Sequence, residues 1–221
     1  MELSMDRYNS VNNTKNDFRI AFWKLYKRNS VEKISVSELC RVAGYNRTTF
    51  YVYYDNIHDL LLRCIEEMLR PIKEHADELQ LVGVPPEDKG KLAQLYLETL
   101  MINKEYVRLL IEHHQLYILE DQYKAILKPV LLRMFADAGL PAESLHYMLE
   151  YQMAAGVNVI AQWFEKQDLG EQEIIDLMVK CAMQGVGNML NANKKAPADA
   201  SQNDEAVIRQ ILKEMAAQKN G

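Results

Sequence analysis

Glycine and proline are scarce in this chain, with nine and six copies among 221 residues. A turn-rich β fold needs many of both, so their scarcity favours helices. No run approaches the ~18–20 apolar residues that a membrane-spanning helix requires, and the polar stretch 1–17 does not resemble a signal peptide. Apolar residues still make up 48% of the chain, enough to fill a core. We therefore expect an all-α, cytoplasmic protein that does not bind a membrane.

Cysteine is rare as well, and its spacing excludes the usual cysteine frameworks. The three copies, Cys40, Cys64 and Cys181, are odd in number, far apart and set in apolar helical patterns. A disulfide scaffold or a zinc site would need closely paired cysteines. We interpret all three as buried thiols in a reducing compartment.

The chain also lacks the basic balance of a general nucleic-acid binder, because its formal net charge is −5. The charge is unevenly distributed, however. Residues 1–54 hold nine Lys or Arg and five Asp or Glu, whereas the remainder holds 17 and 26. A basic first quarter on an acidic body predicts that only the N-terminal part contacts an anionic polymer. Chance asymmetry is the alternative.

Apolar periodicity divides the chain into a small N-terminal module and a larger helical body. We expect a disordered arm over 1–13, a DNA-binding domain over 14–56, a regulatory and dimerisation domain over 57–191, and a linker with a terminal amphipathic helix over 192–221. Pro71 should kink or split a long helix that begins at Ile57. The further expected helices are 14–28, 91–103, 104–115, 119–138, 142–166, 171–191 and 204–218.

Two short helices joined by a tight turn are the most informative feature of the module. Ser35 and Glu38 form a capping-box pattern that starts the first of them, and Gly44 suits its end. Asn46 caps the second, which runs from Arg47 to about Tyr53. This spacing predicts helix-turn-helix geometry, in which one helix braces and the next lies in the major groove of DNA.

The stretch SVSELCRVAGYNRTTFYVYY, residues 35–54, resembles the TetR family of bacterial regulators. The shared pattern is a Ser or Thr cap, a short helix ending in Ala-Gly, a polar cap, a small or polar pair, and then aromatic residues before a Leu-rich helix. The resemblance covers Phe18 to Leu62. It implies an all-α homodimer, a ligand pocket in the larger domain, and release of DNA when a small molecule binds. Ile57 stands where the family usually has a phosphate-contacting Lys, so this contact is either missing or taken over by the following His58.

Residue chemistry assigns roles within this motif. Arg47, Thr48 and Thr49 open the second helix, where Arg can fork onto guanine and a Thr methyl can touch thymine. Tyr51 and Tyr53 can donate hydroxyls to phosphates, although Tyr51 can equally pack against the first helix. The expected DNA-binding set is Lys33, Ser35, Tyr45, Asn46, Arg47, Thr48, Thr49, Tyr51, Tyr53 and His58.

Residues 92–164 are rich in Tyr and Met, which most simply form a core. In the architecture that the resemblance implies, the same residues surround an apolar effector, and the sequence does not separate the two possibilities. Of the adjacent histidines, we expect His113 to face a ligand cavity and His114 to face solvent. The expected core members are Leu95, Tyr96, Leu100, Met101, Tyr106, Tyr117, Tyr123, Met134, Tyr147 and Met153, and the candidate effector pocket is Tyr96, Met101, His113, Tyr117, Tyr123 and Met134.

Enzyme chemistry finds little support. Glu143 and His146 form a single Glu-x-x-His pattern, whereas a di-iron bundle needs two such patterns and further Glu residues. We expect both on the surface, with no metal or cofactor. The leading hypothesis is a repressor that binds pseudo-palindromic duplex DNA and is released by a small-molecule ligand. Alternatives are a TetR-like activator, and a helical metal-binding bundle or enzyme.

The expected dimer interface lies in 142–191. Small residues at 154–156, Gly185 and Gly187 allow helices to approach closely, so two helices from each subunit would pack together. Packing within one chain is the alternative.

Overall fold

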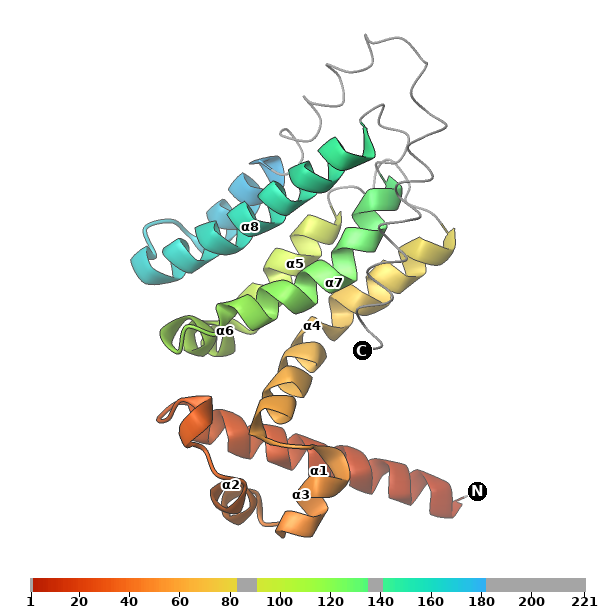
Figure 1. The fold of residues 1–221 in the computed structure, drawn as a ribbon, viewed down its shortest axis with the longest axis vertical. Helices are drawn as coiled ribbons and strands as arrows, with labels where there is room; N and C mark the ends of the chain where they lie inside the picture. The colour runs from red at the N-terminus through yellow and green to blue at the C-terminus, as the bar shows by residue number, and fades with distance from the viewer. Residues whose placement is uncertain (1, 83–90, 135–140, 182–221) are drawn as a thin grey trace. The chain divides into compact units, whose positions relative to one another are not determined.

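The fold was analysed in a computed structural model, which describes residues 2–82, 91–134 and 141–181. Every regular element in these ranges is a helix (Figure 1), which confirms the all-α fold class. The elements are α1 (Glu2–Tyr26), η1 (Val31–Lys33), α2 (Val36–Ala43), α3 (Arg47–Tyr53), α4 (Ile57–Val82), α5 (Lys91–Ile102), α6 (Lys104–Glu112), α7 (Leu116–Met134) and α8 (Ala142–Lys166), followed by helical residues 171–181.

Within those ranges, none of the helices is long and apolar enough to cross a membrane.

Several helix boundaries differ from expectation. Helix α1 begins at Glu2, within the arm expected over 1–13, rather than near residue 14. α4 runs through Pro71 without being split. α6 ends at Glu112 rather than at 115, since His114 adopts a positive φ of 56°. The predicted tail helix over 204–218 lies outside the described residues.

The chain divides into two compact units whose boundaries differ from the expected domains. The first unit comprises Met1–Met68 together with Lys104–Ile118, and the second comprises Leu69–Asn103 and Leu119–Gly221. The first unit thus takes α1, η1, α2, α3, the beginning of α4, and α6. The sequence expectation of a domain over 14–56 had included neither the start of α4 nor α6.

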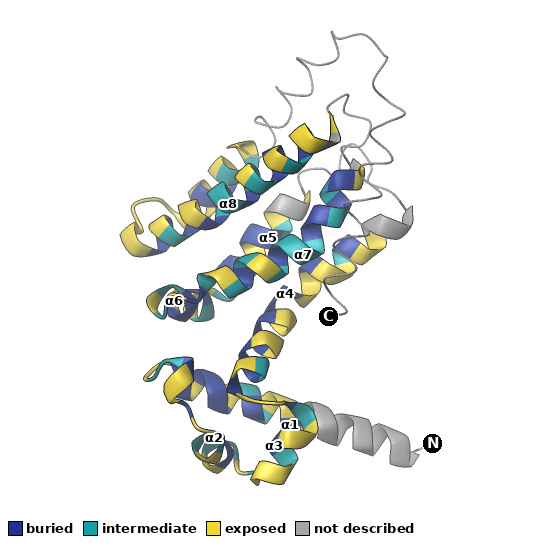
Figure 2. Cartoon of the chain, in the orientation of Figure 1, coloured by how far each residue is buried: buried dark blue, intermediate teal, exposed yellow. Residues whose placement is uncertain are grey.

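An aromatic core holds the first unit together. Phe18 of α1 is fully buried, and its ring meets Phe50 of α3 at 5.6 Å and Tyr54 at 6.0 Å between centroids. Such edge-to-face contacts add to the free energy gained by burying the rings. α2 packs against both α1 and α3, and its Leu39 and Cys40 are buried. Figure 2 colours the buried stretches of the described helices dark blue. Tyr54 ends α3, and burial raises the pKa of its phenol to about 12.

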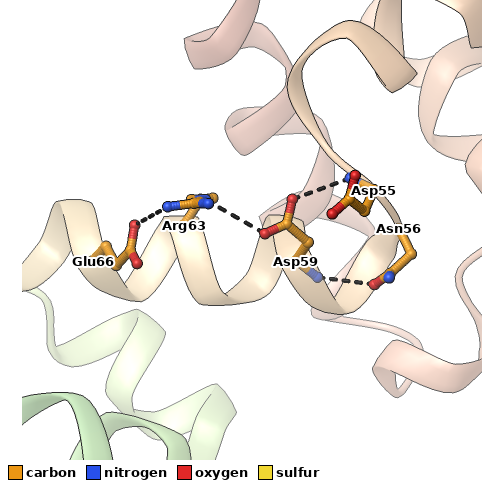
Figure 3. Close-up of polar contacts among 5 residues, drawn as sticks. All are labelled: Asp55, Asn56, Asp59, Arg63 and Glu66. Carbon is orange, nitrogen blue, oxygen red and sulfur yellow. Dashed lines mark hydrogen bonds and ion pairs between the residues drawn. The ribbon is translucent and has the colours of Figure 1, made fainter. Parts of the chain in front are cut away.

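The start of α4 is fixed by reciprocal hydrogen bonds (Figure 3). The Asn56 side-chain oxygen accepts from the Asp59 N–H at 3.0 Å, and the Asp59 carboxylate accepts from the Asp55 N–H at 3.1 Å. Arg63 pairs with Asp59 at 3.4 Å and with Glu66 at 2.9 Å. The two hydrogen bonds satisfy the N–H groups of Asp55 and Asp59 at the helix start, and the ion pair with Arg63 holds the Asp59 side chain in place. They therefore determine the residue at which α4 begins.

α6 completes the first unit by packing against the end of α1. The rings of Trp23 and Tyr106 stack with centroids 4.4 Å apart. His113 donates from Nε2 to the Tyr26 carbonyl oxygen at 2.8 Å. Gln115, which is buried, links Tyr26 to Glu32, because its side chain accepts from the Tyr26 hydroxyl at 3.4 Å and donates to the Glu32 carboxylate at 3.2 Å. The C-terminal end of α1 is thus held by residues about 90 positions later in the chain.

The second unit combines apolar packing with a charged network. Tyr96 of α5 stacks on Tyr123 of α7 with centroids 3.6 Å apart, and both are buried. Lys124 and Lys128 of α7 both donate to Glu150 of α8, and Lys124 also pairs with Glu120 at 2.6 Å. Pairing offsets the cost of burying the Lys128 ammonium.

Candidate nucleic-acid interface

The local structure around α2 agrees with its sequence signals. The Ser35 hydroxyl accepts a hydrogen bond from the Glu38 N–H at 3.1 Å, as the capping-box pattern predicts. At the other end, Gly44 adopts a left-handed φ of 80°, and the N–H groups of Gly44 and Tyr45 both donate to the Cys40 carbonyl. Glycine tolerates this conformation at low cost. The chain therefore turns sharply between α2 and α3.

Asn46 anchors the start of α3 and also engages Thr49. The Asn46 side-chain oxygen accepts from the Thr49 N–H at 2.8 Å and from the Thr49 hydroxyl at 3.0 Å. The Thr49 hydroxyl is therefore used inside the cap, while its methyl group is not part of that hydrogen bond. Thr49 is half-buried, while Arg47 and Thr48 are exposed.

One side of α3 is exposed and contains no carboxylate. Arg47, Thr48, Tyr51 and Val52 are exposed at positions that share a side of a helix, and we call them the α3 face. The whole of α3 has no acidic residue. Val52 is 69% exposed, and the sequence analysis did not single it out. The other side of the helix carries the buried Phe50, which fixes how the α3 face is presented.

Arg47 and Tyr51 contact each other on this face. The Arg47 guanidinium donates to the Tyr51 hydroxyl at 3.4 Å and lies 5.9 Å from the centre of its ring. Tyr51 is 49% exposed, and its ring packs edge-on against Phe50 at 5.3 Å. Tyr51 therefore has both a packing contact, with α3's own Phe50, and an exposed hydroxyl.

Tyr45, in the turn, is tied to α1 through its hydroxyl, which donates to the Asp17 carboxylate at 2.8 Å. Its ring also lies 5.2 Å from that of Phe18. The hydroxyl that a DNA backbone contact would use is thus engaged within the first unit. The ring is half-buried, which leaves part of it accessible.

Lys15 joins the candidate interface from α1. Its ammonium lies 5.8 Å from the centre of the Tyr53 ring, a cation–π arrangement that links α1 to the end of α3. Lys15 is exposed. Sequence reasoning missed it because the only available signal was a positive charge three residues before Phe18, on a helix to which no DNA contact was assigned.

Lys33, Ser35 and His58 are all exposed, as a surface role requires. Ile57, by contrast, is buried in the first unit. The residue that replaces the Lys of the TetR pattern therefore contributes to the core.

The pKa of the Glu32 carboxyl, beside Lys33, is lowered. The largest cause is a hydrogen bond from its own backbone N–H, followed by one from Ser30, and the charges of His58 and His113 act in the same direction.

The residues of the predicted effector pocket belong to different units. Tyr96, Met101 and Tyr123 are buried in the second unit, whereas His113 and Tyr117 belong to the first. His113 bonds the main chain of α1, and Tyr117 is 59% exposed, so Tyr117 is not the core residue that we expected. The Met134 side chain lies outside the described residues. His114 is exposed, as expected.

In the second unit, the Tyr96 hydroxyl and the Nδ1 of His146 are buried and have no hydrogen-bond partner among the described residues. Burial, together with the neighbouring Tyr123 and Glu120, raises the pKa of Tyr96 well above its ordinary value, so the phenol remains neutral. Glu143 is exposed, but His146 is half-buried, which corrects the expectation that both lie on the surface.

The cysteines differ in their surroundings. Cys40 and Cys64 are buried, as expected, and burial raises the pKa of the Cys64 thiol to about 12. Cys181 is exposed, so the expectation of three buried thiols is wrong for this position. Across the ranges described above, no three His, Cys, Asp or Glu side chains are placed to hold a metal ion.

Comparisons with protein-family models and with curated proteins found no match to this chain.

Proposed function

We propose that the chain is a DNA-binding transcriptional regulator, a repressor whose α2 and α3 form a helix-turn-helix. The observation that carries this proposal is the α3 face, an exposed helical surface with an arginine, two side chains that can offer methyl groups, and no carboxylate. A major groove admits one α-helix, and its base edges offer acceptors to Arg and thymine methyls to apolar groups. The resemblance of residues 35–54 to the TetR pattern supports the same conclusion.

The surroundings of α3 favour this role over that of a mere surface helix. Both ends of the turn are fixed, by the positive φ of Gly44 and by the Asn46 cap. The opposite side of α3 is anchored through Phe50 in the aromatic core. A base-contacting side chain must be held rigidly, because small displacements forfeit its hydrogen bonds. Lys15 and Lys33 add exposed positive charge for phosphate contacts.

Operator binding by this class of motif requires two copies, which the proposed homodimer supplies through 142–191. On α8, Tyr147 and Tyr151 are 74% and 73% exposed in the single chain. They are one helical turn apart and form a large apolar surface, which we call the α8 tyrosine pair. The expected contribution of Gly156 is weaker, because its nearest side-chain neighbour is Met178 of the same chain, 3.7 Å from the position of an added Cβ. Gly185 and Gly187 lie outside the described residues.

Release from DNA by a small molecule completes the proposal. Tyr96, Met101 and Tyr123 are the candidate ligand contacts that belong to the second unit. The Tyr96 hydroxyl, buried without a partner, is a group that a ligand atom can satisfy. Binding linkage requires that operator DNA and such a ligand weaken each other's affinity by one common factor.

Selection of bound duplexes from a random DNA library tests the function directly. We expect a pseudo-palindromic sequence, with half-sites about one helical turn apart or a multiple of it. Binding of that sequence should fall steeply as salt rises, because phosphate contacts release counterions. Arg47→Ala should weaken specific binding by about 5- to 100-fold, while Glu143→Gln, on the exposed surface of α8, serves as a control.

Failure of the folded parent protein to enrich any DNA sequence would overturn the proposal. A reporter gene placed downstream of the selected sequence then separates repression from activation, since deletion of a repressor raises expression and deletion of an activator lowers it.

A further inference from the structure

On the α3 face, Arg47 and Tyr51 contact each other, and this contact restrains the position of the Arg47 guanidinium. Arg47 has no ion-pair partner within the part of the chain that the structure describes, and its one side-chain hydrogen bond there goes to the Tyr51 hydroxyl. A guanidinium has five N–H donors. One bond to Tyr51 therefore restrains the group while leaving most of its donors available.

Tyr51 is well suited to restrain a neighbour. Its ring has only two side-chain torsions and packs against Phe50, which is fully buried and contacts both Phe18 and Tyr54. The ring is thus supported by the core of the first unit. Arg47, four residues earlier, lies on the same side of the helix, with its guanidinium near the ring as well as bonded to the hydroxyl.

We propose that Tyr51 is a positioning residue, which holds the Arg47 guanidinium in the orientation that contacts a guanine in the operator. This inference rests on the proposed DNA-binding function. A flexible arginine loses side-chain entropy when it binds a base in two-pronged geometry. Because Tyr51 already restrains the Arg47 side chain in the free protein, less side-chain entropy is lost when Arg47 binds. The resulting gain in affinity applies only to the base that Arg47 contacts.

The alternative role for Tyr51 is direct donation of its hydroxyl to a phosphate. The two roles predict different patterns of loss. A phosphate contact contributes to binding of every sequence, whereas positioning of Arg47 contributes only where a guanine lies opposite Arg47. Tyr51→Phe removes the hydroxyl and keeps the ring, so it separates these roles without disturbing the packing on Phe50.

The experiment compares four proteins: the parent, Tyr51→Phe, Arg47→Ala and the double variant. For each protein, the affinity is measured for the selected operator and for copies of the operator in which one guanine at a time is replaced. Arg47→Ala should identify the contacted guanine by lowering discrimination there about 5- to 100-fold. Tyr51→Phe should lower discrimination at that same position about 2- to 5-fold, in keeping with one modest hydrogen bond. In the double variant, loss of the hydroxyl should have no further effect. Tyr106→Phe removes a tyrosine hydroxyl from α6 of the same unit and keeps the ring that stacks on Trp23, so it is the matched control and should leave discrimination unchanged.

Equal weakening by Tyr51→Phe for all sequences, additive with Arg47→Ala, would overturn the positioning role and leave DNA binding intact. Unchanged discrimination in Arg47→Ala would overturn it as well. A parent protein that enriches no sequence removes the proposed function, and this inference with it.

Discussion

Exposed side chains on α3 determine which bases the proposed interface can distinguish. Thr48 and Val52 are one helical turn apart and exposed beside the Arg47–Tyr51 pair. Neither Val52 nor the Thr48 methyl can form a hydrogen bond with a base, but both can contact the C5 methyl of thymine. The α3 face therefore offers a hydrogen-bonding edge and an apolar edge side by side.

Val52→Ala should weaken operator binding about 2- to 10-fold, because it removes two methyl groups from contact with a thymine. Replacing that thymine by deoxyuracil removes the partner methyl and should cause a similar loss in the parent. The two losses should not add when both changes are made. Ile20→Ala, a change at an aliphatic residue of α1 that is 60% exposed, is the control. Additive losses would show that Val52 contacts no thymine methyl.

At the same scale, sequence reasoning succeeded where the signal was local. Ser35, Gly44 and Asn46 each have a turn or cap chemistry that depends on a few neighbouring residues, and the structure places all three as expected. It gave no sign that the Tyr45 hydroxyl donates to Asp17, 28 residues away. Such a partner leaves no periodic trace in the sequence. The prediction that Cys181 is buried failed for a similar reason, since the residue is exposed. An apolar helical pattern does not say whether another helix covers a given position.

At the scale of single helices, hydrogen bonds from its first residues determine where the long helix α4 begins. Asn56 and Asp59 satisfy amide groups that a bare helix start would leave open (Figure 3). The helix itself continues through Pro71, although proline has no N–H to donate to the preceding turn. This placement also explains Ile57, which the cap directs into the core at the first helical position.

Asn56→Ala should lower the free energy of unfolding by about 0.5–2 kcal/mol, the usual cost of losing a helix N-cap. Chemical denaturation followed by circular dichroism measures it. Asp55→Ala is the matched control, because only the main chain of Asp55 takes part in the cap. Equal destabilisation by the two variants would show that the side chain of Asn56 is not what stabilises the start of α4.

Between α7 and α8, the charged network predicts an acid-sensitive second unit. The pKa of Glu150 lies below its ordinary value of 4.5, mainly because Lys128 donates a hydrogen bond to its carboxylate, while partial burial opposes the shift. A carboxylate whose pKa is lower in the folded than in the unfolded state stabilises the fold at pH values above the unfolded-state pKa. This stabilisation is lost as the pH falls through the folded-state pKa. We therefore expect Glu150→Gln to reduce thermal stability at pH 7.

The same variant should flatten the decline in melting temperature below about pH 4.5, relative to the parent. Glu143→Gln, on the exposed surface of α8, is the control. If the variant and the parent have the same melting temperature at pH 7 and the same decline below about pH 4.5, the network contributes no net stability.

At the scale of the whole molecule, the proposed dimer depends on the α8 tyrosine pair. Two neighbouring exposed tyrosines on one side of a helix form a patch that a partner surface can cover, and buried aromatic residues often dominate the free energy of association. The sequence had grouped Tyr147 with the core, which is wrong for the single chain. Helical periodicity correctly identified an apolar position, but it does not distinguish a core from a surface that a second copy can cover.

Sedimentation of the parent protein at micromolar concentration should show a dimer. Replacing both Tyr147 and Tyr151 by Ser should weaken the dimer at least tenfold, since two aromatic side chains lose their contacts. Tyr117→Ser removes another exposed tyrosine, from the first unit, and should leave association unchanged. A parent that remains monomeric would contradict the proposed assembly.

The composition of the first unit has a consequence for engineering. Residues 104–118 belong to it although they follow residue 68 by 36 positions, and they supply the stacking partner of Trp23 and the hydrogen-bond partners of Tyr26. A hybrid regulator made by transplanting residues 1–68 onto a foreign body would leave these two aromatic side chains without their native neighbours. Under the proposed function, DNA specificity is therefore better transferred by exchanging the α3 face alone, because the described hydrogen bonds and ring contacts of its side chains do not involve α6.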